Sequence, residues 1–179
     1  MSEYYYLVAT LPMLRKDMSE YMSHSEFLSL CKDKVTMRDY KMLENATLSG
    51  NGTANGKFMK DFTHFRSMVE KELAFQRANK LKIKDAKYEN KGDKESKITE
   101  RIRKAVSEDN PLEGEKIILG LYWDYLEEHI GNGHYFDITF LLGYSLRLQI
   151  LSRLSLFDLD KGNAEFERLF GNLRTQIFQ

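Results

Sequence analysis

Cysteine and proline are almost missing from this chain of 179 residues, and each scarcity excludes something. The single cysteine, Cys31, cannot form an internal disulfide, which excludes a small fold stapled by disulfide bonds. The only two prolines are Pro12 and Pro111, so long stretches carry no residue that breaks a helix. Most of the eleven glycines lie outside the segments with helical periodicity. These scarcities favour long helices.

Net charge is also missing, because 27 basic residues balance 27 acidic ones. A neutral chain creates no global field that steers it toward nucleic acid or anionic lipid. We therefore expect no nucleic-acid partner, and we expect any charged partner to be recognised by a local patch. The N-terminus lacks the basic and long apolar regions of a signal peptide, which predicts a cytoplasmic location.

The longest apolar run covers residues 135–157 and is the predicted centre of the fold. Its bulky residues recur at steps of three and four, which is typical of a helix buried on most sides. A membrane span of this length is excluded because Asp137, Arg147 and Arg153 interrupt the run. Each such charge at mid-bilayer costs about 2.5–3.5 kcal/mol. We therefore predict a helix buried in the core of a water-soluble protein that does not insert directly into the membrane.

Caps and periodicity predict several further helices. Residues 4–11 are expected to form a short helix ended by Pro12. Ser23 and Glu26 have the spacing of a capping box, and Thr36 with Asp39 resembles a second cap, which predicts a hairpin of two short helices.

Three longer helices complete the prediction. One covers about 57–79, and one lies between Pro111 at its start and Gly131 at its end. A last helix, opened by Asp158 or Asp160, has an apolar face of Phe166, Leu169, Phe170, Leu173 and Ile177. The predicted fold is all-α: one helical domain over residues 1–179, a bundle of about six or seven helices around the central helix at 135–157.

Charge is unevenly distributed along the chain. Residues 80–104 hold ten basic and five acidic side chains, whereas residues 107–137 hold eight acidic side chains and one lysine. For the basic arm at about 80–104 we expect a mobile, solvated hairpin, and the functional hypothesis for it is contact with an acidic protein surface.

Tyrosine suits both cores and interfaces, and we expect two of the three N-terminal tyrosines in the core. The candidate partner-binding residues are Tyr4, Tyr5, Lys82, Lys84, Lys87, Lys97, Arg101 and Lys104.

Two motifs that resemble functional sites are better explained as ordinary structure. Residues 52–57 resemble a phosphate loop, but the loop is one residue short and Phe58 replaces the magnesium-binding Ser or Thr. We predict a flexible turn there. His129 and His134 stand near Glu127 and Glu128 in a spacing that matches no metal motif, so we predict a solvated helix end.

Cys31 lies on or beside the apolar stripe of its helix, without a fixed basic neighbour, which predicts a buried structural thiol. No Ser-His-Asp or paired-carboxylate pattern stands out. We therefore predict no catalytic, cofactor-binding or metal-binding residues, no cofactor, and a protein that is not an enzyme.

Segments from both ends of the chain carry a resemblance to a known family. They are residues 4–12 (YYYLVATLP), 25–28 (SEFL), 146–151 (LRLQIL) and the stretch from 160–162 (DKG) to Phe166. They resemble an uncharacterised bacterial family encoded among the subunits of V/A-type ATPases. That family is similar to a shortened form of the C-type, or d-type, subunit of the central stalk.

The resemblance implies an all-helical subunit or assembly factor without an active site, which docks on the central stalk of a proton- or sodium-translocating ATPase. Its partners would be other ATPase subunits, including the membrane ring. The chain would then be cytoplasmic and peripheral to the inner membrane. The second hypothesis is a free-standing helical adaptor that binds an acidic protein or nucleic acid through the basic arm at 80–104.

Overall fold

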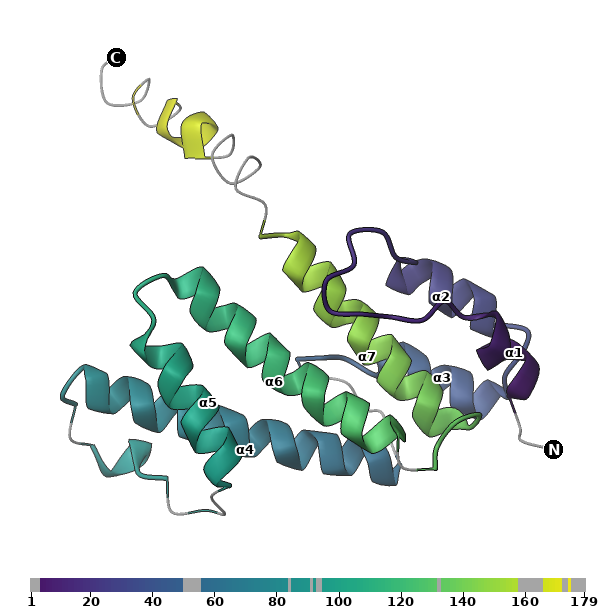
Figure 1. Ribbon diagram of the computed structural model, residues 1–179, viewed down its shortest axis with the longest axis horizontal. Helices are drawn as coiled ribbons and strands as arrows, with labels where there is room; N and C mark the ends of the chain where they lie inside the picture. The colour runs from purple at the N-terminus through teal and green to yellow at the C-terminus, as the bar shows by residue number, and fades with distance from the viewer. Residues whose placement is uncertain are drawn as a thin grey trace.

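The computed structural model describes residues 4–49, 56–83, 85–90, 92, 95–131, 133–157, 166–171 and 174, and these described residues contain helices but no strand (Figure 1). The predicted all-α class is therefore confirmed. In chain order the elements are α1 (Tyr5–Thr10), α2 (His24–Cys31), α3 (Met37–Asn45), α4 (Lys57–Lys80), the short 3-10 helix η1 (Ala86–Tyr88), α5 (Ser96–Ser107), α6 (Pro111–Gly131) and α7 (Ile138–Ser155).

The predicted central helix is α7. Every residue from 141 to 148 is buried, which requires packing partners on all sides of the helix. Asp137 caps this helix, because its Oδ1 accepts a hydrogen bond from the Phe140 backbone N–H at 3.1 Å. The helix therefore begins at Ile138 and not at Tyr135, whose side chain is exposed.

Two groups of helices cover α7 from opposite sides (Figure 1). The short helices α2 and α3 pack on one side, and α6 packs on the other. Behind α6 lie α4 and α5, which contact each other, and α5 also contacts α6. The core is thus a stack of helices with α7 between the N-terminal group and the longer helices.

The predicted caps of the first hairpin are present. Ser23 Oγ accepts the Glu26 backbone N–H at 3.2 Å, while Glu26 Oε2 accepts the Ser23 backbone N–H at 2.8 Å. Thr36 Oγ1 accepts the Asp39 backbone N–H at 3.2 Å. These bonds satisfy N–H groups that have no partner within the helix, so both helices begin where the sequence indicates.

Helix α5 lies within and just beyond the predicted basic arm and was not itself predicted as a helix. It buries Ile98, Ile102 and Ala105 between α4 and α6. Spacings of four and three place these residues on one helical face. This apolar face is hard to recognise in the sequence, because the segment is rich in charged residues.

The C-terminal part of the chain is described only in residues 166–171 and 174. Residues 166–171 are helical, and the rings of Phe166 and Phe170 stack with their centroids 6.0 Å apart. Phe166, Leu169 and Phe170 are exposed, and in Figure 1 this helix lies away from the bundle. The other residues of the predicted last helix, Asp158, Asp160, Leu173 and Ile177, lie outside the described residues. Within the described residues, no helix is both long and apolar enough for a transmembrane span.

Candidate functional site

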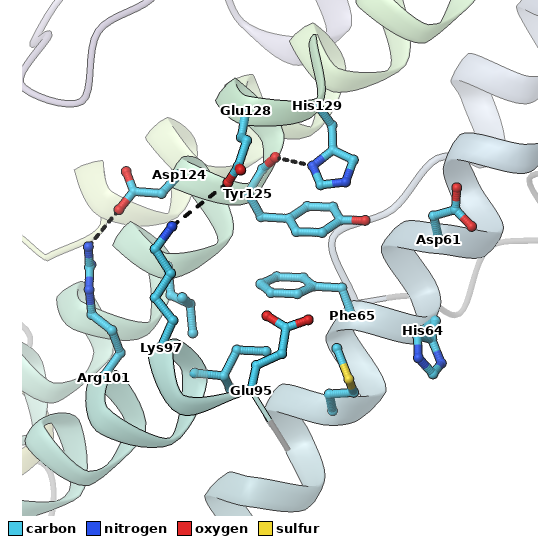
Figure 2. A pocket seen from close by; sticks show the side chains of 13 residues that line it. Asp61, His64, Phe65, Glu95, Lys97, Arg101, Asp124, Tyr125, Glu128 and His129 are labelled. Carbon is cyan, nitrogen blue, oxygen red and sulfur yellow. Dashed lines mark hydrogen bonds and ion pairs between the residues drawn. The ribbon is translucent and has the colours of Figure 1, made fainter. Parts of the chain in front are cut away.

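A groove with a volume of about 560 Å³ lies between α4, α5 and α6. Figure 2 shows the side chains that line it. One part of the groove is built around a stack of rings, and the neighbouring part is built from ion pairs. Together they form the candidate binding site of the molecule.

The ring stack consists of Phe65, Tyr125 and His129. Phe65 and Tyr125 face each other with ring centroids 3.9 Å apart and planes inclined by 14°. His129 covers Tyr125 at 3.9 Å, since residues four apart on α6 lie above one another. His129 Nδ1 is 2.9 Å from the Tyr125 carbonyl oxygen, and this hydrogen bond holds the imidazole in place.

Two ion pairs connect α5 to α6 beside the stack. Lys97 Nζ lies 3.9 Å from Glu128 Oε2, and Arg101 Nη2 donates a hydrogen bond of 2.8 Å to Asp124 Oδ2. Partial burial raises the pKa of Asp124, but the bonds and charges of Lys16 and Arg101 outweigh this effect and lower it. The predicted basic and acidic stretches therefore partly neutralise each other within the molecule.

The groove also contains two carboxylates outside these ion pairs, those of Asp61 and Glu95. Among the described residues, neither forms a hydrogen bond or an ion pair. Burial, and then the negative charges of Asp61 and Glu95, raise the pKa of Tyr125 to about 12. In Figure 2 the Tyr125 hydroxyl points to the side of the groove where Asp61 lies, whereas His64 points away from the stack. The groove thus keeps two carboxylates available for a ligand.

The comparison with known proteins gives one family. A family model described as protein of unknown function (DUF2764) matches residues 68–177, which is more than half of the chain. The chain belongs to this family. The match begins within α4 and includes α5, α6 and α7, whereas α1, α2 and α3 precede it. No match was found among curated proteins or among solved structures.

The N-terminal tyrosines, which precede the DUF2764 match, differ from the prediction in one respect. Tyr4 is 5% exposed and its hydroxyl donates a hydrogen bond to Asp39, but Tyr5 is 48% and Tyr6 is 80% exposed. Only one of the three is therefore in the core, and the expectation of two is wrong. Helical spacing explains this, because Tyr4 shares its inward face with Leu7 and Val8.

The predicted basic candidates are spread over several surfaces. Lys97 and Arg101 line the groove, whereas Lys82, Lys87 and Lys104 are exposed elsewhere. Lys87 Nζ lies 5.8 Å from the centre of the Tyr88 ring. Lys84 lies outside the described residues. The groove itself was not predicted, because its residues come from three separate helices.

Cys31 and the two histidines near the end of α6 have structural surroundings. Cys31 is fully buried, and burial raises the pKa of its thiol to about 11, which confirms a structural cysteine. No three described His, Cys, Asp or Glu side chains are grouped so as to hold a metal ion. His134 pairs instead with Asp137. Residues 52–55, four of the six residues of the predicted phosphate-loop-like turn at 52–57, lie outside the described residues.

One histidine–serine pair was not predicted. His24 Nε2 lies 2.8 Å from Ser145 Oγ, and Gln149 Nε2 lies 3.4 Å from the same nitrogen. Ser145 is fully buried within α7, so no substrate reaches its hydroxyl. The pair is 121 residues apart in the sequence and no local spacing signals it. It joins α2 to α7 and is part of the structure, not a catalytic dyad.

Proposed function

We propose that this chain is a non-enzymatic subunit or assembly factor of a V/A-type, proton- or sodium-translocating ATPase. It is similar to a shortened C-type (d-type) subunit of the central stalk and docks on that stalk. Its partners are the other stalk subunits and the membrane ring, which hold it on the cytoplasmic side of the inner membrane. The proposal starts from the resemblance of the two ends of the chain to that family.

The observation that carries the proposal is that the N-terminal segments and the region of α7 meet in one packed unit. The Tyr4 backbone N–H donates to the Phe136 carbonyl at 3.0 Å, and the Tyr144 hydroxyl donates to the Pro12 carbonyl at 2.9 Å. The rings of Phe27 and Tyr144 pack at 5.2 Å between centroids. Three of the four segments that carry the resemblance, residues 4–12, 25–28 and 146–151, therefore belong to a common body of α1, α2 and α7, whereas residues 160–162 of the fourth lie outside the described residues.

This body presents a surface that suits a protein partner. Four aromatic side chains, which we call the aromatic row, are in sequential contact: Tyr6, Tyr5, Phe136 and Tyr135. Tyr5 lies 5.5 Å from Tyr6 and 4.9 Å from Phe136 between ring centroids. Tyrosine is enriched in protein interfaces because it buries a large ring and retains a polar end. Tyr5 and Tyr6 are the most direct anchors for docking.

The groove supports binding better than catalysis. None of the described residues that line it is a Ser, Thr or Cys that could act as a nucleophile. His129 is stacked on Tyr125 and engages a backbone carbonyl, so its ring is held as part of the wall. A protein that couples other subunits needs stiffness and complementary surfaces more than reactive groups.

The proposal is tested by affinity purification of the tagged chain from native membranes in mild detergent. We expect V/A-type ATPase subunits to be recovered with it. Replacing Tyr5 and Tyr6 by serine should reduce that recovery about tenfold, the effect of losing about 1.4 kcal/mol of binding free energy. The matched control replaces two exposed apolar residues at and just beyond the C-terminal cap of α4, Leu81→Ser and Ile83→Ser, and should leave recovery unchanged. Repeated purifications without any ATPase subunit would contradict the proposal.

The second candidate is a free-standing adaptor that binds an acidic protein or nucleic acid through the arm at 80–104. The exposed side chains of Lys82, Lys87 and Lys104 favour it. The ion pairs of Lys97 and Arg101 with α6 reduce the positive charge that the arm can offer. Binding that disappears with added salt and needs no ATPase subunit would support this candidate.

A further inference from the structure

We infer that the groove between α4, α5 and α6 binds a basic segment of a partner protein through arginine side chains of that segment. This inference goes beyond the proposed function, because it assigns a second contact surface and does not depend on which complex contains the chain. The aromatic row and the groove are built from different residues. Their tests can therefore fail separately.

The charges of the groove decide the class of ligand. Glu128 and Asp124 are paired with Lys97 and Arg101, but Asp61 and Glu95 have no charged partner among the described residues. Both carboxylates line the groove, on different sides of the ring stack: Asp61 lies on the side of the Tyr125 hydroxyl, and Glu95 lies beside Phe65 (Figure 2). An anion would be repelled there, whereas a cation would be attracted.

The geometry then distinguishes between cations. Among the described residues, no three His, Cys, Asp or Glu side chains are placed so that they could bind a metal ion. The Tyr125 hydroxyl forms no hydrogen bond with any described residue, so its oxygen can accept one. A guanidinium group carries five N–H donors in one plane and stacks on aromatic rings, which an ammonium group does less well. The half-buried imidazole of His129 offers such a ring at the end of the stack.

The size and the rim of the groove favour a polypeptide over a free small cation. A volume of about 560 Å³ exceeds the needs of one guanidinium group and leaves room for neighbouring residues. Beside the stack, the pairs Lys97–Glu128 and Arg101–Asp124 place two positive side chains on α5 opposite two negative ones on α6 (Figure 2). A peptide lying along α6 can meet these charges with its own side chains and backbone, whereas free arginine cannot.

The test measures binding of fluorescently labelled hexa-arginine, hexa-lysine and hexa-glutamate peptides to the full chain by fluorescence anisotropy at low salt. We expect hexa-arginine to bind and hexa-glutamate not to bind. Hexa-lysine should bind at least about threefold more weakly than hexa-arginine, because an ammonium group stacks poorly on aromatic rings. The double variant Asp61→Asn with Glu95→Gln keeps the shape of the groove and should weaken hexa-arginine binding about tenfold. The control Asp33→Asn with Glu44→Gln removes two exposed charges elsewhere and should leave binding unchanged.

Circular dichroism of each variant checks that the fold is retained. The inference would be overturned by no binding of hexa-arginine, by equal binding of the arginine and lysine peptides, by unchanged binding to the Asp61 and Glu95 variant, or by an equal loss in the control. Free spermine is the comparison for a small cation. Binding of spermine as tight as that of hexa-arginine would overturn the assignment to a protein segment.

Discussion

At the scale of single residues, the side chain of Gln149 is the main polar connection between α7 and the chain after α3. Its Nε2 donates to the Ala46 carbonyl at 2.7 Å, and its Oε1 accepts the Leu48 backbone N–H at 2.9 Å. Replacement by leucine keeps the volume but leaves both backbone groups without this partner. We expect Gln149→Leu to lower the free energy of unfolding by about 1–3 kcal/mol, measured by urea denaturation.

The control for this variant is Ser152→Ala, an exposed position on the same helix. Its free energy of unfolding should remain within about 0.5 kcal/mol of the wild type. Equal stability of Gln149→Leu and the wild type would show that water replaces both bonds at no cost.

His24 should make the stability depend on pH. Burial lowers the pKa of His24 below its usual value of 6.5, so the unfolded chain binds the proton more readily than the folded one. The contribution is complete above pH 6.5 and is lost as the pH falls through the lowered pKa. We expect the free energy of unfolding to start to fall as the pH drops below 6.5 and to level off once the pH is below the lowered pKa of His24. His24→Gln keeps a polar partner for Ser145 but cannot titrate, and its stability should fall less; identical pH profiles would exclude His24 as the cause.

At the scale of elements, two glycines of α6 offer a matched pair. A Cβ atom on Gly114 would lie 2.7 Å from the Ala105 backbone carbonyl oxygen of α5, whereas one on Gly120 meets only the end of the Arg101 side chain at 3.9 Å. Both substitutions gain helix propensity, so the difference isolates the contact between helices. Gly114→Ala should destabilise the protein by about 1–3 kcal/mol, because α5 must move.

Gly120→Ala should be neutral or stabilise the protein by up to about 1 kcal/mol. Thermal or urea unfolding of the two variants checks the pair. A loss of stability in Gly120→Ala equal to that in Gly114→Ala would mean that the close approach of α5 to α6 is not what the substitution disturbs.

Local patterns were sufficient to predict most of the elements. The caps at Ser23 and Thr36 and the start of α6 at Pro111 were predicted correctly, because each depends on residues within one helical turn. The start of α7 was placed three residues too early, since the cap of Asp137 was not recognised. Helix α5 was missed because its charged residues outnumber its buried ones.

The ion pairs between α5 and α6 did have a signal in the sequence. Lys97 and Arg101 are four residues apart, and so are Asp124 and Glu128. On antiparallel helices this reversed order brings Lys97 to Glu128 and Arg101 to Asp124. The ring stack of the groove has no such signal, since Phe65 lies 60 positions before Tyr125 and only the tertiary fold unites them.

At the scale of the whole molecule, α7 connects two surfaces with different properties. The aromatic row lies where α1 meets the chain just before α7, and the groove lies between α4, α5 and α6. The buried residues of α7 contact helices on both sides, which makes the body stiff between them. A docking protein benefits from such stiffness, because a load on one surface then reaches the other.

The most direct test of the docking proposal is the native mass of the complex that contains the chain, measured by native mass spectrometry after gentle purification from membranes. We predict one assembly that includes V/A-type ATPase stalk subunits and a fixed number of copies of this chain. A chain found only alone, only with further copies of itself, or only with proteins unrelated to the ATPase would contradict the proposal.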